Sequence, residues 1–197
     1  MSHPQLTVLI PAAGPSSRLG QAKQLVYYKT GTLIQNAVST AYSISPKEVI
    51  VVTGAKAEDV RGSVRQTSVR WAHNPHWKDG MGSSIATGAA LIDQGSSAVM
   101  IFLCDQWRLQ TSDLQLLSDS WLANPERIVC ARASDRNMPP VIFPSRFFSN
   151  IKELSGDNGA QSILEDHAGT VKPVLLDNAA WDLDLKSQLK QLSLIEL

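Results

Sequence analysis

Short apolar runs alternate along the chain with longer segments whose apolar residues recur every three or four positions. The runs predict six strands, at residues 6–12, 48–53, 69–72, 98–104, 127–131 and 171–175. The periodic segments predict three longer helices, with apolar faces at 33–41, 85–92 and 114–121, and shorter helices at 147–154, 160–166 and 186–192. Strands that alternate with helices are typical of an α/β fold with a mostly parallel sheet.

Length and composition narrow the class of protein. The 197 residues show neither an internal repeat nor a linker, so we expect one domain over residues 1–197. Lys and Arg number 18 against 18 Asp and Glu, and a net charge of zero gives no basic field to hold a nucleic acid or a membrane surface. The run 98–104 is too short to span a membrane, and Cys104 and Cys130 lack the spacing of a disulfide or zinc site. We therefore expect a cytoplasmic protein with reduced cysteines.

The segment after the first predicted strand suits a polyphosphate. In open α/β sheets, ligands bind beyond the carboxyl ends of the strands. Ala12, Ala13 and Gly14 let the backbone approach a ligand there, and exposed N–H groups can bind phosphate oxygens. Arg18 and Lys23 add two cations. The spacing from Gly14 fits neither a Walker loop nor a GxGxxG turn, and an ordinary turn with two solvated cations is the alternative.

A second segment, residues 74–84, leads from a predicted strand into a predicted helix. Gly80 and Gly82 allow a tight turn, and Ser83 or Ser84 can cap the helix, whose N-terminal N–H groups then point toward the site. A flexible loop that ends in a helix cap is the alternative interpretation.

Carboxylates occur at two further places. Asp105 follows the buried run 98–104 and is expected at the same sheet edge as the cationic loop, where a magnesium ligand belongs. Asp182 and Asp184 lie just before the last predicted helix. By themselves, two acids before a helix are more typical of an N-cap.

These segments, in this order, resemble the MobA-like NTP transferase family. The family opens with G-x-S-x-R-[ML]-G-x-x-K-x-L, whose positions are occupied here by Gly14, Ser16, Arg18, Leu19, Gly20, Lys23 and Leu25. Residues 74–85 resemble N-P-x-W-x-x-G-M-x-x-S-[IL] of the branch that cytidylates the molybdenum cofactor, and residues 103–107 resemble L-C-D-Q-P. Residues 137–143, 154–161 and 182–185 are similar to the family's G-x-P-V-x-F, G-D-x-G-A-R and D-[IV]-D segments.

The resemblance implies a three-layer α/β/α, Rossmann-like nucleotidyltransferase fold of the GT-A-like type. It implies transfer of CMP from CTP to the molybdopterin cofactor, with release of pyrophosphate and with Mg²⁺ bound by Asp105 and Asp184, Asp182 being the second candidate. The implied catalytic residues are Arg18, Lys23 and Asp105. The implied nucleotide-binding residues are Ala12, Ala13, Gly14, Ser16, Arg18, Lys23, Gly80, Met81, Ser83 and Ser84. The implied contacts of the phosphorylated acceptor are Gln106, Pro140, Asp157 and Gly159.

The chain departs from the family's pattern at several positions. Trp107 replaces proline, Gln161 replaces a frequent arginine, and Leu185 replaces the threonine after the acid pair. Loss of the arginine weakens the anchoring of an acceptor phosphate. The alternatives are therefore transfer of GMP from GTP to the same cofactor, transfer to a sugar phosphate or another small acceptor, or a non-catalytic module that binds the cofactor or docks on a molybdoenzyme maturation partner.

Overall fold

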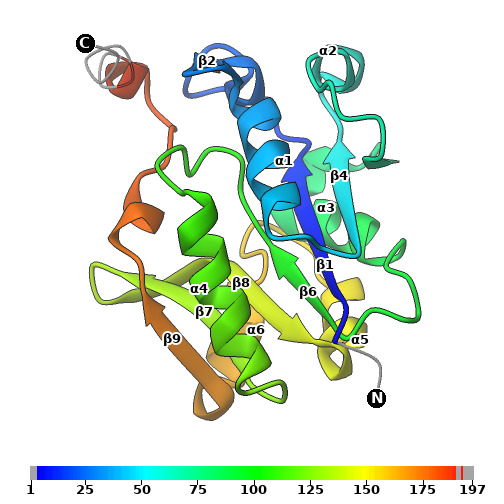
Figure 1. The fold of residues 1–197 in the computed structure, drawn as a ribbon. Coiled ribbons are helices and arrows are strands. Elements are labelled where there is room, and N and C mark those ends of the chain that lie inside the picture. Colours follow the sequence, from blue (N-terminus) through cyan, green and yellow to red (C-terminus); the bar gives the residue numbers. More distant parts are fainter. Residues whose placement is uncertain (1–3, 190–191, 193–197) are drawn as a thin grey trace.

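A seven-stranded sheet in the order β5-β4-β1-β6-β8-β7-β9 forms the centre of the molecule (Figure 1). The computed structural model describes residues 4–189 and 192. The strands of this sheet are β1 (Leu6–Ala12), β4 (Glu48–Thr53), β5 (Arg70–His73), β6 (Ala98–Ile101), β7 (Ile128–Ala133), β8 (Arg136–Pro144) and β9 (Val171–Leu175). A separate hairpin pairs β2 (Tyr27–Tyr28) with β3 (Gly31–Thr32). Within the large sheet, β8 is antiparallel to β6 and β7, and the other pairs are parallel, as the sequence predicts.

Helices cover both faces of the sheet, which confirms the predicted three-layer architecture. Successive side chains of a strand point to opposite faces, and in β1 Val8 and Ile10 pack on one side while Leu9 packs on the other. The first face carries α1 (Leu33–Ser43), α2 (Ala57–Gly62) and α4 (Thr111–Leu122). The second carries α3 (Met81–Ala89), α5 (Phe148–Lys152) and α6 (Gln161–Asp166), so that in Figure 1 α1 and α4 lie in front of the sheet and α3 and α6 behind it.

Short 3-10 helices make up several connections: η1 (Lys23–Leu25), η2 (Trp77–Asp79), η3 (Ser145–Phe147), η4 (Ala168–Thr170), η5 (Asp177–Ala180) and η6 (Lys186–Gln188). The last predicted helix, 186–192, is thus a 3-10 turn over residues 186–188, and residues 190–191 of that prediction lie outside the described residues. Among the helices that the structure describes, none is long and apolar enough to cross a membrane.

The strands of the apolar runs agree closely with prediction, whereas β8 is a strand that the sequence pattern does not predict. The predicted strand at 98–104 is shorter than expected, because β6 ends at Ile101 and the chain then turns. Two prolines, Pro139 and Pro140, interrupt β8, and proline cannot donate to a ladder. The pairing with β7 shifts register at this point, between Cys130 and Ala131, so that the strand continues past the prolines.

The carboxyl ends of the neighbouring parallel strands come together at one edge of the sheet. The backbone N–H of Ala55, after β4, donates to the carbonyl of Ala13, after β1, at 3.0 Å. The N–H of Asn74, after β5, donates to the carbonyl of Thr53 at 2.8 Å. These hydrogen bonds join the loops at the edge where ligands bind in α/β sheets.

Candidate active site

Two polar side chains hold the loop that follows β1. Ser16 adopts a left-handed conformation, with φ of 55°, and its hydroxyl accepts a hydrogen bond from the backbone N–H of Lys23 at 3.0 Å. The side-chain amide of the buried Gln24 donates to the carbonyls of Ala12 and Gly14, at 3.1 and 2.9 Å. Gln24 was not predicted as a site residue, because it occupies a variable position of the motif between Lys23 and Leu25.

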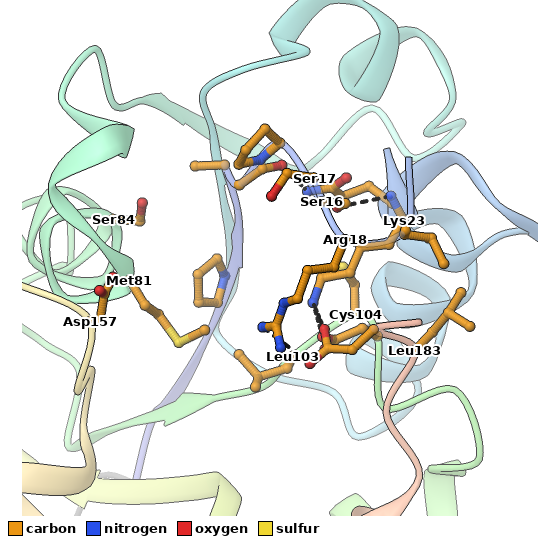
Figure 2. Close-up of a pocket in the computed structure, with 18 residues that line it drawn as sticks. Ser16, Ser17, Arg18, Lys23, Met81, Ser84, Leu103, Cys104, Asp157 and Leu183 are labelled. Atoms are coloured by element: carbon orange, nitrogen blue, oxygen red, sulfur yellow. Dashed lines mark hydrogen bonds and ion pairs between the residues drawn. The ribbon is translucent and has the colours of Figure 1, made fainter. Parts of the chain in front are cut away.

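Lys23 lies between the two acids that were predicted to bind a metal. Its ammonium contacts Oδ2 of Asp105 and lies 3.1 Å from Oδ1 of Asp184. The Nη2 atom of Arg18 lies 3.6 Å from Oδ2 of Asp184. Figure 2 shows the side chains of Arg18 and Lys23 extending side by side from the loop. The cationic loop and the acids therefore meet at one sheet edge, as predicted.

The Lys23–Asp105 pair is the most buried part of this cluster. The side chain of Asp105 is 9% exposed and that of Lys23 22%, whereas that of Arg18 is 74% exposed. Burial by itself would lower the pKa of Lys23. The charge of Asp105 and its hydrogen bond outweigh burial, with a smaller contribution from Asp184, and raise this pKa above its usual value. Lys23 is therefore charged at neutral pH and paired with both acids, while Arg18 contacts Asp184 from the solvent side of the cluster.

Cys104 lies next to this ion pair and lines the same cavity. Burial, together with the charge of Asp105, raises the pKa of its thiol to about 12. The thiol is therefore protonated at neutral pH, and since the thiolate is the reactive form, Cys104 has the properties of a packing residue and not of a nucleophile.

The cluster opens onto a cavity of about 350 Å³. Ten of the predicted site residues form part of its wall: Ala13, Gly14, Ser16, Arg18, Lys23, Met81, Ser84, Asp105, Asp157 and Asp184. Of the predicted residues, all of them in the described part of the chain, seven lie outside this wall: Ala12, Gly80, Ser83, Gln106, Pro140, Gly159 and the second metal candidate, Asp182. The cavity thus joins the cationic loop to the second glycine-containing segment across the sheet edge.

One buried side chain, that of Asn74, organises residues 74–84. Its amide nitrogen donates to the hydroxyls of Ser83 and Ser84, at 2.9 and 3.0 Å. Its carbonyl oxygen accepts a hydrogen bond from the backbone N–H of His76 at 2.9 Å. A buried amide needs such partners, and here they tie the two ends of the segment together. Asn74 opens the family motif but was not predicted as a site residue.

The expected helix cap at Ser83 or Ser84 is wrong. The helix α3 begins earlier, at Met81, and its N-cap is Gly80, whose φ of 96° favours glycine. Ser83 therefore lies within the first turn, where its hydroxyl reaches the carbonyl of Gly80 at 2.9 Å. Ser84 faces the cavity and Asn74.

Gly80 and Gly82 bring this segment against the loop between α5 and α6. The N–H of Gly82 donates to the carbonyl of Gly156 at 2.8 Å. A Cβ atom at Gly80 would lie 2.3 Å from backbone atoms of Gly156, so that a side chain would push the segments apart. This packing places Asp157 on the cavity wall beside Met81, opposite Arg18 and Lys23 in Figure 2.

The predicted acceptor residues fall into two groups. Asp157 lines the cavity, and Gly159, with φ of 53°, packs under Met81. Gln106 and Pro140 are buried, and the side-chain amide of Gln106 donates to the carbonyls of Pro139 and Ala179, at 2.7 and 2.8 Å. The structure thus shows Gln106 joining β8 to the segment after β9, and its contact with an acceptor stays a prediction.

Asp184, and not Asp182, faces the cationic loop. The segment that carries Asp184 is held by a hydrogen bond from the N–H of Leu183 to the carbonyl of Asp105, at 3.1 Å. The side chain of Gln188 accepts from the N–H groups of Asp184 and Leu185, at 2.8 and 2.7 Å. The N-cap of η6 is Leu185, so the alternative in which the acids cap the last helix is wrong.

A stack of aromatic rings and one arginine also holds this segment. The guanidinium of Arg108 lies 3.6 Å from the centre of the Trp181 ring and 4.9 Å from that of Trp107. Trp107 in turn meets Tyr28 edge to face, at 5.2 Å between ring centres. The tryptophan that replaces the family's proline therefore takes part in joining the two acid-bearing segments.

Asp105 and Asp184 are hard oxygen ligands of the kind that Mg²⁺ takes in proteins. Within residues 4–189 and 192, no group of three or more His, Cys, Asp or Glu is placed to hold a metal ion. A metal at this pair would take its other ligands from a bound phosphate and from water, which is how sites built from one or two carboxylates hold Mg²⁺.

The mostly parallel sheet, with a cationic loop and acids at the carboxyl ends of its strands, is that of an α/β nucleotidyltransferase. Residues 8–171 match the MobA-like NTP transferase domain, and the chain belongs to this family. The family and fold that the sequence predicts are thus confirmed.

Two curated relatives carry names of different enzyme classes, an oxidoreductase and a cytidylyltransferase. The chain is 31% identical over 183 residues to the nicotine blue oxidoreductase of Paenarthrobacter nicotinovorans, which covers 88% of this chain and 86% of that protein. It is 30% identical over 78 residues to the molybdenum cofactor cytidylyltransferase of Escherichia coli, which covers 39% of this chain and 40% of that protein.

Solved structures share the fold over nearly the whole chain. The Rv0371c protein of Mycobacterium tuberculosis superimposes with a TM-score of 0.84 at 23% identity, covering 98% of each chain. A structure of that protein in complex with manganese gives a TM-score of 0.73 at 20% identity over 89% of each chain. A nucleotidyl transferase of Methanothermobacter gives 0.79 at 16% identity over 95% of each chain.

Proposed function

We propose that this protein transfers CMP from CTP to a molybdopterin-type cofactor, with release of pyrophosphate and with Mg²⁺ as cofactor. The observation that carries the proposal is the meeting of Arg18, Lys23, Asp105 and Asp184 on one cavity wall. Membership of the NTP transferase family supports the reaction class. The Escherichia coli relative and the cytidylyl-type motif at residues 74–85 support the nucleotide and the acceptor.

The reaction requires charge neutralisation and positioning more than acid–base chemistry. An oxygen of the acceptor phosphate attacks the α-phosphorus of CTP, a new P–O bond forms, and the bond to the bridging oxygen breaks as pyrophosphate leaves. A phosphate monoester, with a second pKa of about 6, is largely a dianion at neutral pH and needs no general base. Arg18 and Lys23 offset the negative charge on the transferred and leaving phosphates.

Asp105 and Asp184 are the residues that would hold Mg²⁺, and the manganese complex of the Mycobacterium protein supports a divalent ion in this fold. When bound, the ion would polarise the α-phosphate and stabilise its added charge. The chain's own part is to keep the acids close together, through the Leu183–Asp105 hydrogen bond and the Arg108 stack.

A pyrophosphate-release assay tests the proposal. Each of the four nucleoside triphosphates is supplied with and without the molybdopterin cofactor and with and without Mg²⁺. We expect release with CTP when both cofactor and metal are present. Release with GTP and not with CTP, or release only with a sugar phosphate, would overturn it. A redox reaction in place of release would overturn it too, and this outcome is included because one relative is named an oxidoreductase.

Variants of two site residues then test the assigned roles. Lys23→Ala and Asp105→Asn should each lower the rate of pyrophosphate release about 100-fold, the usual effect of losing one group that stabilises a transition-state charge. Lys152→Ala and Asp166→Asn change exposed charges on α5 and α6 and serve as controls. Full turnover of Lys23→Ala or of Asp105→Asn would refute the assignment.

A further inference from the structure

We propose that Lys23 takes the place of the metal ion in the free protein and thereby couples metal binding to nucleotide binding. Its ammonium joins Asp105 and Asp184, the two acids assigned to the metal. The inference rests on the proposed function, because it names the order in which that site is filled.

In the free protein each acid already has a cationic partner. Lys23 contacts Oδ2 of Asp105 and reaches Oδ1 of Asp184 at 3.1 Å, while Oδ2 of Asp184 lies 3.6 Å from Arg18. Two carboxylates this close to one ammonium would repel each other without it, and the burial of Asp105 strengthens that repulsion. A divalent ion that enters this site must therefore compete with the ammonium of Lys23.

Lys23 has a second set of partners within reach when a nucleotide is bound. Its backbone is fixed, because its N–H donates to the hydroxyl of Ser16 at 3.0 Å, whereas its side chain is a flexible four-carbon stem. The wall of the same cavity is formed by Gly14, Ser16 and Arg18, the loop suited to phosphate oxygens. A triphosphate on this loop attracts the ammonium and frees the two carboxylates.

Binding of a divalent ion and binding of a nucleotide are therefore coupled, each changing the affinity for the other. Without nucleotide, Lys23 keeps the affinity of the acids for a divalent ion low. With nucleotide, the ammonium moves to the phosphates and the affinity rises, and by linkage the ion raises the affinity for nucleotide by the same factor. Arg18 is a different case, because it is exposed and touches a single acid from outside.

Binding of Mn²⁺, followed by the loss of its free electron paramagnetic resonance signal, tests this inference without turnover. The full chain is titrated with and without a CTP analogue that carries a methylene group between the α- and β-phosphorus. Mn²⁺ bound by the analogue alone is measured in protein-free samples and subtracted. For the unaltered protein we expect the analogue to tighten Mn²⁺ binding about tenfold or more.

Lys23→Met should bind Mn²⁺ about tenfold more tightly than the unaltered protein when no nucleotide is present. The analogue should tighten Mn²⁺ binding by a smaller factor in this variant than in the unaltered protein, because only the phosphate ligands and not the displacement of an ammonium then contribute. Arg18→Met removes the same charge from the same cluster without freeing the site, and its Mn²⁺ affinity should change much less. Lys23→Gln is the second neutral variant, used if Lys23→Met does not fold. Weaker or unchanged Mn²⁺ binding by the Lys23 variants, or equal tightening by Arg18→Met, would overturn the proposal.

The two proposals fail separately. Tight Mn²⁺ binding by Lys23→Met together with no pyrophosphate release from any nucleotide supports the coupling and refutes the proposed reaction. CMP transfer by the unaltered protein together with unchanged Mn²⁺ binding by Lys23→Met supports the reaction and refutes the coupling.

Discussion

The backbone N–H of Leu183 donates to the backbone carbonyl of Asp105 at 3.1 Å, so that the residue before Asp184 is fixed to the other acid of the site. This one hydrogen bond joins the segment that follows the central strand β6 to the segment that follows the edge strand β9. Leu183 is fully buried, in a cluster that includes Tyr28 and Trp107. The separation of the two acids is thus set by packing around Leu183 and by the nearby stack on Arg108.

Trp181→Ala should reduce both CMP transfer and Mn²⁺ affinity about tenfold, because Arg108 then loses the ring that holds the segment before Asp184. Stability should change little, since Trp181 is 38% exposed. The two quantities are measured by pyrophosphate release and by Mn²⁺ titration. Leu116→Ala truncates an exposed apolar residue on α4 and is the control. Unchanged metal affinity in Trp181→Ala would contradict a positioning role.

Gly14→Ala separates folding from ligand binding. A Cβ atom at Gly14 would meet no atom of the described residues within 4 Å, so the variant should fold with unchanged thermal stability. The same Cβ would stand in the cavity where the backbone approaches the phosphates. We expect CTP affinity, measured by calorimetry, to fall about tenfold, the size of the loss of one good contact with a charged group.

Gly62→Ala is the matched control for Gly14→Ala, because Gly62 ends α2, away from the cavity wall. Its CTP affinity should equal that of the unaltered protein. Equal affinity in Gly14→Ala as well would mean that the loop does not approach the nucleotide.

Asn74→Ala should destabilise the protein by about 1–3 kcal/mol, because the hydroxyls of Ser83 and Ser84 lose a partner and the N–H of His76 loses its acceptor. The change is measured as the free energy of unfolding in urea. The discrimination between CTP and GTP should also weaken, since residues 74–84 then lose the Asn74 hydrogen bonds that join the two ends of this segment. Asn150→Ala changes an exposed residue on α5 and is the control, so it should alter neither the free energy of unfolding nor the discrimination between nucleotides. An Asn74→Ala protein with unchanged stability and unchanged discrimination would contradict the role assigned to Asn74.

Much of the fold follows from the sequence because the central strands are buried on both faces. The central strands β1 and β4 begin and end where the apolar runs predict, and so does the more exposed edge strand β9. Strand β8 does not, because its prolines oppose strand pairing in general and are tolerated here only through the register shift opposite them. Its place between β6 and β7 depends on long-range pairing that no local pattern contains.

The charged residues of the site follow from the sequence, and the residues that position them do not. Lys23 and Asp105 stand in recognisable motifs of the segments that follow strands β1 and β6. Gln24 and Asn74 act through hydrogen bonds to backbone and hydroxyl groups, and such partners become visible only in three dimensions. The choice of Asp184 over Asp182 also needs the structure, because it depends on which side chain turns toward Lys23.

Stability should fall as the pH rises from 8 to 10, in part because of the buried thiol of Cys104. Burial raises the pKa of this thiol from 9.0 to about 12, so that between these two values the folded chain keeps a proton that the unfolded chain has lost. Stability then decreases with pH, by about 1.4 kcal/mol between pH 8 and pH 10 for one such group. In Cys104→Ala this part of the decrease should disappear, which urea unfolding at the two pH values measures. Cys130→Ala should also reduce the loss of stability with pH, since burial raises the pKa of that thiol to about 11. An equal pH dependence in Cys104→Ala and in the unaltered protein would show that the Cys104 thiol ionises alike in the folded and unfolded chain.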